Sequence, residues 1–277
     1  GPDAYMGASA NSALHFALCH NNPTASVVTV GGAMLMTNNA VVNLWAARTN
    51  AAVDYGLRMG ITNDLTVASA ATLNLVSQAT NGGAPLVCVR NLIVDTGGSI
   101  KGDSFGFIAA NGLGAGGNAG GGGYGGAGGG ANGGVSYGSS NAPVHPGSGG
   151  GPIASAGAGG GAVRVQAGGT VRVNGIISAN GGAVSAASSG GGAGGAIYLT
   201  CIEYEGGANG WLKAHGGNAS GATSGGGGGG RIAVWRRRAS GTAYAEASGG
   251  TGTTANGSEG TVVWGPLAFP GSIYYFL

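Results

Sequence analysis

Apolar residues alternate with polar or small ones in short segments along most of the chain. Leu65 and Val67, followed by Leu73 and Leu75, show the two-residue period of strands with one buried face. Asn and Gly close most of these segments, at positions where turns need residues that tolerate a positive φ. No segment has a helical period, so the pattern predicts an all-β protein.

The strand-like segments recur at nearly constant intervals. In the first hundred residues Leu35, Leu65 and Leu92 hold equivalent positions, spaced by 30 and 27. From residue 160 onward a second series is spaced by 34, 35 and 30, and it consists of Val163, Ile197, Ile232 and Val262. One such unit cannot bury its own apolar face, so successive units must stack. The sequence therefore predicts a parallel β-helix, or β-solenoid, with like positions one above another.

This register also predicts which side chains form the core. Six residues of the later repeats should point inward and stack in columns: Val163, Val165, Ile197, Leu199, Ile232 and Val234. Cys201 continues this alternation, and we interpret it as a small buried hydrophobe. The three cysteines fit no metal-binding or redox spacing, although Cys19 and Cys88 could form a disulfide.

Glycine supplies 66 of the 277 residues, and its runs fall at an equivalent place in successive repeats. In a solenoid, insertions at one repeat position project from one face. Ordering glycine costs about 0.5–1 kcal/mol more per residue than ordering alanine, so we expect close backbone packing to offset this cost. We predict laterally packed, polyglycine-II-like segments, with flexible linkers as the alternative. The runs are roughly 112–134, 147–161, 189–195, 216–230 and 249–260.

These patterns divide the chain into five parts. We expect an N-terminal cap or assembly segment, then β-solenoid coils, a long glycine-rich insertion, glycine-rich β-solenoid repeats, and a C-terminal strand or tail. The corresponding ranges are 1–26, 27–110, 111–161, 162–265 and 266–277. No apolar stretch is long enough to span a bilayer.

The composition favours an extracellular or cell-surface protein. Only 7% of the residues are charged, against a usual share of about 25%. The net charge is +2 and hydrophobic residues make up 43%, which argues against a disordered chain. Solubility must therefore come from amides, hydroxyls and exposed backbone. The nearly neutral net charge and the lack of aromatic residues between the basic ones also argue against nucleic-acid binding.

Few acidic residues could carry chemistry. Glu203 and Glu205 lie on one face if Tyr204 belongs to a strand, and an exposed strand edge explains them more simply than an acid/base pair. Asp95 and Asp103 could face each other across adjacent turns. We expect no catalytic residue and no cofactor.

Metal binding is also not expected. A metal site would need a fourth ligand beside the group His15, Cys19 and His20. His145 and His215 sit beside glycine turns and are most simply explained as solvated.

Aromatic and basic residues offer a possible ligand surface. Tyr124, Tyr137 and Trp211 stand beside the glycine runs and could stack on a carbohydrate. The one concentration of charge could bind an anionic polysaccharide, or it could be a solvated strand end or a contact between subunits. It comprises Arg231, Arg236, Arg237 and Arg238.

Two stretches resemble a widespread class of secreted glycine-rich repeat proteins of environmental bacteria. They are TVGGAMLMTNNAVVNLWA with ITNDLTVASAATLNLV, and NLIVDTGGSI with the glycine-rich segments that follow it. The resemblance covers residues 27 to about 264 and implies export and a structural or adhesive role. More loosely, the glycine runs are similar to the polyglycine-helix bundles of phage tail-fibre adhesins. Neither resemblance supplies a catalytic residue.

We expect a non-enzymatic extracellular protein that assembles with copies of itself into a filament, sheath or surface layer. At the C-terminus Ile273, Tyr275 and Leu277 alternate as an added strand would, without charges to protect the edge. A heterologous contact that does not close generates a filament. A carbohydrate-binding surface adhesin is the first alternative, and a polysaccharide lyase on a β-helix is the second.

Overall fold

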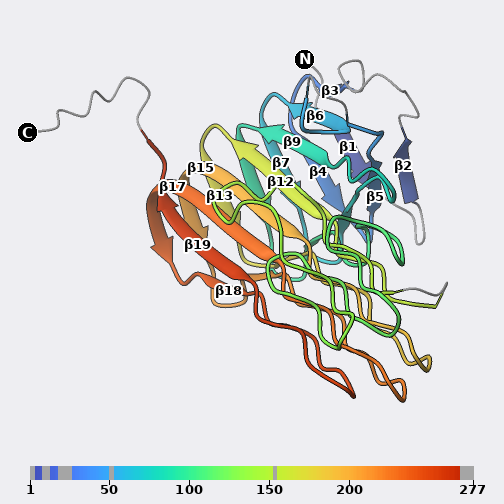
Figure 1. Ribbon diagram of the computed structural model, residues 1–277. Coiled ribbons are helices and arrows are strands. Elements are labelled where there is room, and N and C mark those ends of the chain that lie inside the picture. Colours follow the sequence, from blue (N-terminus) through green and yellow to red (C-terminus); the bar gives the residue numbers. More distant parts are fainter. Residues whose placement is uncertain (1–3, 8–12, 18–26, 50–52, 152–154, 269–277) are drawn as a thin grey trace, which may run out of the picture.

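The computed structural model describes residues 4–7, 13–17, 27–49, 53–151 and 155–268. Every regular element in these residues is a β-strand, and the strands form one 12-stranded and one 7-stranded sheet. Every strand pairing is parallel. Figure 1 shows the strands stacked side by side along one direction. The prediction of an all-β architecture of stacked parallel strands is confirmed.

The strands form three ladders, which we call A, B and C. Ladder A consists of β3 (Val27–Val30), β6 (Leu57–Ile61), β9 (Pro85–Val89), β12 (Ala162–Ala167), the first halves of β15 (Ala196–Gly206) and β17 (Arg231–Gly241), and β19 (Thr261–Pro266). Ladder B consists of β1 (Ala4–Gly7), β4 (Met34–Thr37), β7 (Asp64–Val67), β10 (Asn91–Val94), β13 (Thr170–Val173) and the second halves of β15 and β17. Ladder C consists of β2 (Ala13–Ala17), β5 (Val41–Trp45), β8 (Thr72–Val76), β11 (Ser99–Lys101), β14 (Ile176–Ser178), β16 (Trp211–Lys213) and β18 (Tyr244–Glu246).

The strands make complete coils. β15 and β17 each contribute to two ladders, so each ladder holds seven strand segments in the described part of the chain. The chain passes from ladder B to C to A in every coil, beginning with β1 and ending with β19. All three ladders therefore end at the same coil.

The predicted core register is confirmed. The six predicted residues are at most 2% exposed, and Cys201 is fully buried beside them. Val163, Ile197 and Ile232 pair across β12, β15 and β17, which places them in one column. Arg164 is also buried, at 3% exposure, although it occupies the outward position between two core residues. Another part of the chain must therefore cover the outside of ladder A.

Turns separate the ladders, and their residues fit their backbone geometry. Between β4 and β5, Asn38 and Asn39 have φ of 54° and 62°. Asn adopts this left-handed region more readily than most residues, which agrees with its predicted role in the turns that end strands.

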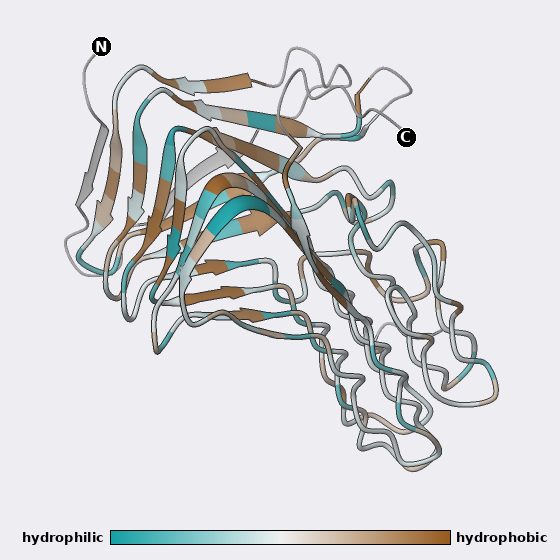
Figure 2. Cartoon of the chain, turned by 90° about the vertical axis from the view of Figure 1, so that its left-hand side faces the viewer, coloured by the Kyte–Doolittle hydropathy of each residue, from teal (hydrophilic) through white to brown (hydrophobic). Residues whose placement is uncertain are grey.

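The connections from ladder C back to ladder A change along the chain. The early ones are short, whereas the later ones are the long glycine-rich segments 102–161, 179–195, 214–230 and 247–260. Figure 2 shows these segments extending together from one side of the strands. We call them the glycine layer.

Leu199→Asp should prevent folding. Leu199 is fully buried, and an unpaired charge at a buried site costs about 3–5 kcal/mol. Thermal unfolding followed by circular dichroism should show loss of the folded state. Thr200→Asp, at the neighbouring half-buried, outward position of β15, should still fold. A Leu199→Asp protein that melts like the wild type would mean that the core assignment is wrong.

Candidate functional site

The centre of the glycine layer is the unbroken run from Gly225 to Gly230. Successive N–H groups of this run point to three neighbouring segments in rotation, and the pattern repeats after three residues. The donors and their acceptor carbonyls are Gly225 with Ala119, Gly226 with Ala255, Gly227 with Gly217, Gly228 with Gly122, Gly229 with Ser258 and Gly230 with Ala214.

The carbonyls of the same run accept hydrogen bonds from further segments. The donors to residues 225–229 are, in order, the N–H groups of Gly191, Gly129, Gly250, Gly194 and Gly126. The run is therefore bonded to six segments around it: 119–122, 255–258, 214–217, 191–194, 126–129 and the one containing Gly250. A strand in a sheet has two such neighbours.

Steric contact explains why this run contains only glycine. A Cβ atom added at any of its six positions would lie between 1.9 and 2.2 Å from a backbone oxygen of a neighbouring segment. No ordinary side chain fits, because nonbonded carbon atoms approach only to about 3.5–4.0 Å. At the surface of the layer, where one side faces solvent, the chain instead carries residues such as Thr251, Thr253 and Asn256.

Tyr124 was predicted to belong to a ligand surface, and this prediction is wrong. Its side chain is 0% exposed, because the glycine layer folds over the outer face of ladder A and encloses the ring. The ring lies 4.9 Å from that of Tyr137, and the Arg231 guanidinium lies 5.5 Å from its centre. Burial raises the pKa of the Tyr124 hydroxyl far above its ordinary value, so the group stays neutral.

Tyr137 is half-buried and is held by its own hydroxyl. The hydroxyl donates to the Pro146 carbonyl at 2.6 Å and accepts from the Ser148 hydroxyl at 3.0 Å. Ser148 in turn accepts from the Gly114 N–H at 3.0 Å. These contacts fix the long insertion 102–161 to itself and engage the Tyr137 hydroxyl as both donor and acceptor.

The predicted arginine cluster does not form one surface. Arg231 is buried, and its Nε donates to the Tyr137 carbonyl at 3.0 Å. Arg236 lies over the Trp264 ring, 4.7 Å from its centre. Arg238 remains exposed and pairs with Glu203 at 3.6 Å within the same chain.

The predicted acidic pair is occupied by arginines of neighbouring coils. Glu203 pairs with Arg238, and Glu205 accepts from Arg172 Nε at 2.5 Å. The Asp103 carboxylate accepts from the Ser178 hydroxyl at 2.7 Å. These contacts tie one coil to the next.

Trp211 stacks with Tyr244 of the following coil on the outer face of ladder C. The ring centres are 4.6 Å apart, the planes are inclined by 18°, and Lys213 Nζ lies 4.8 Å from the Trp211 ring centre. The two faces that meet are closed to a ligand. His215, in the turn after this strand, is half-buried and lies 3.5 Å from Glu246. Burial lowers the pKa of His215, and the nearby Glu246 opposes this.

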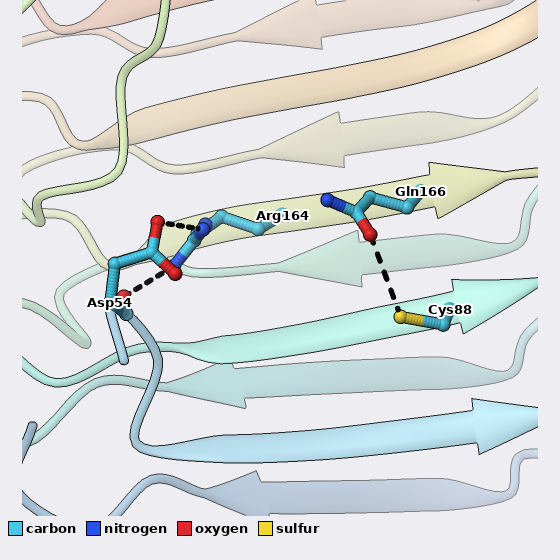
Figure 3. A network of polar contacts seen from close by, with 4 residues as sticks. All are labelled: Asp54, Cys88, Arg164 and Gln166. Atoms are coloured by element: carbon cyan, nitrogen blue, oxygen red, sulfur yellow. Dashed lines mark hydrogen bonds and ion pairs between the residues drawn. The ribbon is translucent and has the colours of Figure 1, made fainter. Parts of the chain in front are cut away.

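An ion pair with one buried partner joins the connection between β5 and β6 to strand β12 of ladder A. Arg164 donates to the Asp54 carboxylate at 2.7 Å and to the Asp54 backbone carbonyl at 2.5 Å (Figure 3). The Arg164 side chain is 4% exposed, whereas that of Asp54 is 59% exposed. Near them on the outer face, Cys88 lies 3.8 Å from Gln166.

Several predicted residues fall outside the described ranges. Ile273, Tyr275 and Leu277 follow the last described residue, and Cys19 and His20 lie in the segment 18–26. In the described part, Cys88 and Cys201 are free cysteines.

The described residues show neither a metal site nor a membrane-spanning helix. No three His, Cys, Asp or Glu side chains gather there as metal ligands would. The described residues also include no helix with the length and apolar character of a membrane span. Comparison with protein-family models, curated proteins and solved structures finds no match to this chain.

The C-terminal end of the coils carries two apolar side chains whose exposure the sequence did not predict. Val262 holds the inward position of the last coil, yet it is 40% exposed because no later described strand covers it. Tyr244 ends the outward aromatic column of ladder C and is 36% exposed. The repeat itself could have predicted this exposure, since the last unit of a stacked series has no neighbour on one side.

Gly227→Ala should destabilise the protein, whereas Gly60→Ala should not. A Cβ at Gly227 would lie 1.9 Å from the Gly192 carbonyl oxygen, but one at Gly60 would meet nothing within 4 Å. Overpacking of this kind costs about 1–3 kcal/mol. Chemical denaturation of the two variants measures the difference directly. Equal unfolding free energies would show that the glycine layer is loosely packed.

Proposed function

We propose that the protein is a non-enzymatic structural building block that assembles with copies of itself, head to tail, into an extracellular filament, sheath or surface layer. The observation that carries the proposal is that each of the three ladders holds seven strand segments in the described residues, so all end at the same coil. A second copy placed along the axis would bring β1, β2 and β3 beside β17, β18 and β19. Every ladder would then continue with parallel strands.

Hydrogen-bonding groups at the C-terminal end support this contact. The N–H groups of Thr261 and Leu267 donate inward, to Gly230 and Arg236 of β17. Because successive N–H groups of a strand alternate in direction, those of Val262 and Trp264 point to the open edge. Such an edge is a template for pairing with another chain.

We further propose that the glycine layer is a polyglycine-II-like bundle that stiffens this building block. Its support is the three-residue rotation of partners along Gly225 to Gly230, which matches a helix of three residues per turn without internal hydrogen bonds. The six neighbouring segments fit the same arrangement.

Filaments of the full chain should be visible by electron microscopy. Parallel strands lie about 4.7–4.9 Å apart, so seven coils should give an axial repeat of about 33 Å. Val262→Lys should abolish the filaments, because it places a charge where two copies would meet. Val135→Lys is the matched control: Val135 is 65% exposed, but it lies in the long glycine insertion. Monomers at high protein concentration, or equal assembly of both variants, would contradict the proposal.

Truncation after Pro270 tests the other predicted element of assembly. The run with Ile273, Tyr275 and Leu277 follows β19 in the sequence, and we propose that it contributes to the contact between copies. The truncated protein should stay folded by circular dichroism but form no filaments. If it still assembles with the same axial repeat, the tail is not part of the contact.

A further inference from the structure

A shallow groove lies on the outer face of ladder A, near its N-terminal end. It runs across β3, β6 and β9 to the turn after β12, and its lining includes Arg58, Gly60, Cys88, Arg90 and Gly168. The groove is separate from the C-terminal end of the coils and from the glycine layer.

Two glycines in this groove differ from those of the glycine layer. A Cβ at Gly60 would meet no atom within 4 Å, and one at Gly168 would meet only the Val89 carbonyl oxygen, at 3.9 Å. Neither Gly60 nor Gly168 has a positive φ, so their backbone conformation does not require glycine. Gly60 lies inside strand β6, where glycine is less favourable than a residue with a side chain. Packing does not require either glycine, but together they keep the groove hollow.

Two arginines flank the hollow. Arg58 and Arg90 are both exposed, and within the described residues neither has a carboxylate at ion-pair distance. Arg164, Arg172 and Arg238, in contrast, each pair with an acidic side chain. The groove therefore carries positive charge that the described part of the chain does not neutralise.

Cys88 positions one of these arginines. Arg58 Nε donates to the Cys88 sulfur at 3.4 Å, and the Cys88 thiol in turn lies 3.8 Å from Gln166 Oε1. A guanidinium has five N–H donors, so this contact holds Arg58 at the groove and leaves most of its donors available.

We propose that this groove binds an acidic polysaccharide through its carboxylate groups. Arginine binds carboxylates with paired, charge-assisted hydrogen bonds, and two arginines on either side of a hollow suit a chain with repeated acidic groups. The hollow above Gly60 and Gly168 admits the sugar ring between them. The described lining residues include no aromatic side chain on which nucleic-acid bases would stack, so recognition here rests on the charge of the two arginines.

Binding of polygalacturonate, measured by isothermal titration calorimetry at low salt, tests the proposal. The double variant Arg58→Gln and Arg90→Gln should weaken binding by roughly tenfold or more, as loss of charge-assisted hydrogen bonds implies. The matched control, Arg236→Gln with Arg238→Gln, removes the same charge at the other end of the molecule and should bind like the wild type. Equal loss in both variants would mean diffuse charge attraction and would overturn the site.

Gly60→Val separates the groove from the fold. Valine suits a strand and meets no neighbour at its Cβ, so the melting temperature should be unchanged or higher while binding weakens. Undiminished binding by this stable variant would overturn the proposal. Neutral dextran should not bind, and dextran sulfate distinguishes recognition of sulfate from that of carboxylate. Binding of poly-glutamate but not of polygalacturonate would show that the groove recognises an acidic peptide instead.

Discussion

Contact between peptide backbones, closer than any Cβ atom permits, is the constraint on which the rest of the structure depends. Around Gly225 to Gly230 six neighbouring segments satisfy the hydrogen bonds that a buried backbone requires. The apolar side chains that the layer buries, Tyr124 and Ala193 among them, pack against Ala162 and Ala196 at the start of ladder A strands. The coils hold the glycine layer in position, because each of its segments leaves one coil and returns to the next. The layer and the apolar columns that contain Val163 and Ile197 therefore stabilise each other.

The repeat was predictable because both of its components are periodic. Alternation places Leu199 and Val234 inward, and the recurring interval places them in columns, so the core could be derived without the structure. The position of the glycine runs followed from the same interval. Polyglycine-II-like conformation and self-assembly stay proposals, because they depend on backbone geometry and on contacts with other copies.

The remaining features depend on how the long insertion folds back, and no period encodes that. Tyr124 is flanked by glycines in the sequence, a context that gives no sign of burial, yet the insertion buries it against ladder A. Arg164 is buried for the same reason, and its partner Asp54 is 110 positions away. Gly60 and Gly227 are the same residue type in opposite surroundings, and only the unbroken run around Gly227 hints at the difference.

The order in which the layer can form follows from its connectivity. Gly225 donates to Ala119, and Gly226 donates to Ala255, so the central run joins segments made long before and after it. Contacts between residues so distant in sequence form slowly, because the intervening chain must first be ordered. The insertion 102–161 therefore emerges during synthesis without its central partner. The glycine layer can be completed only after the last coils have been made. The C-terminal quarter of the chain therefore limits the rate at which the layer folds.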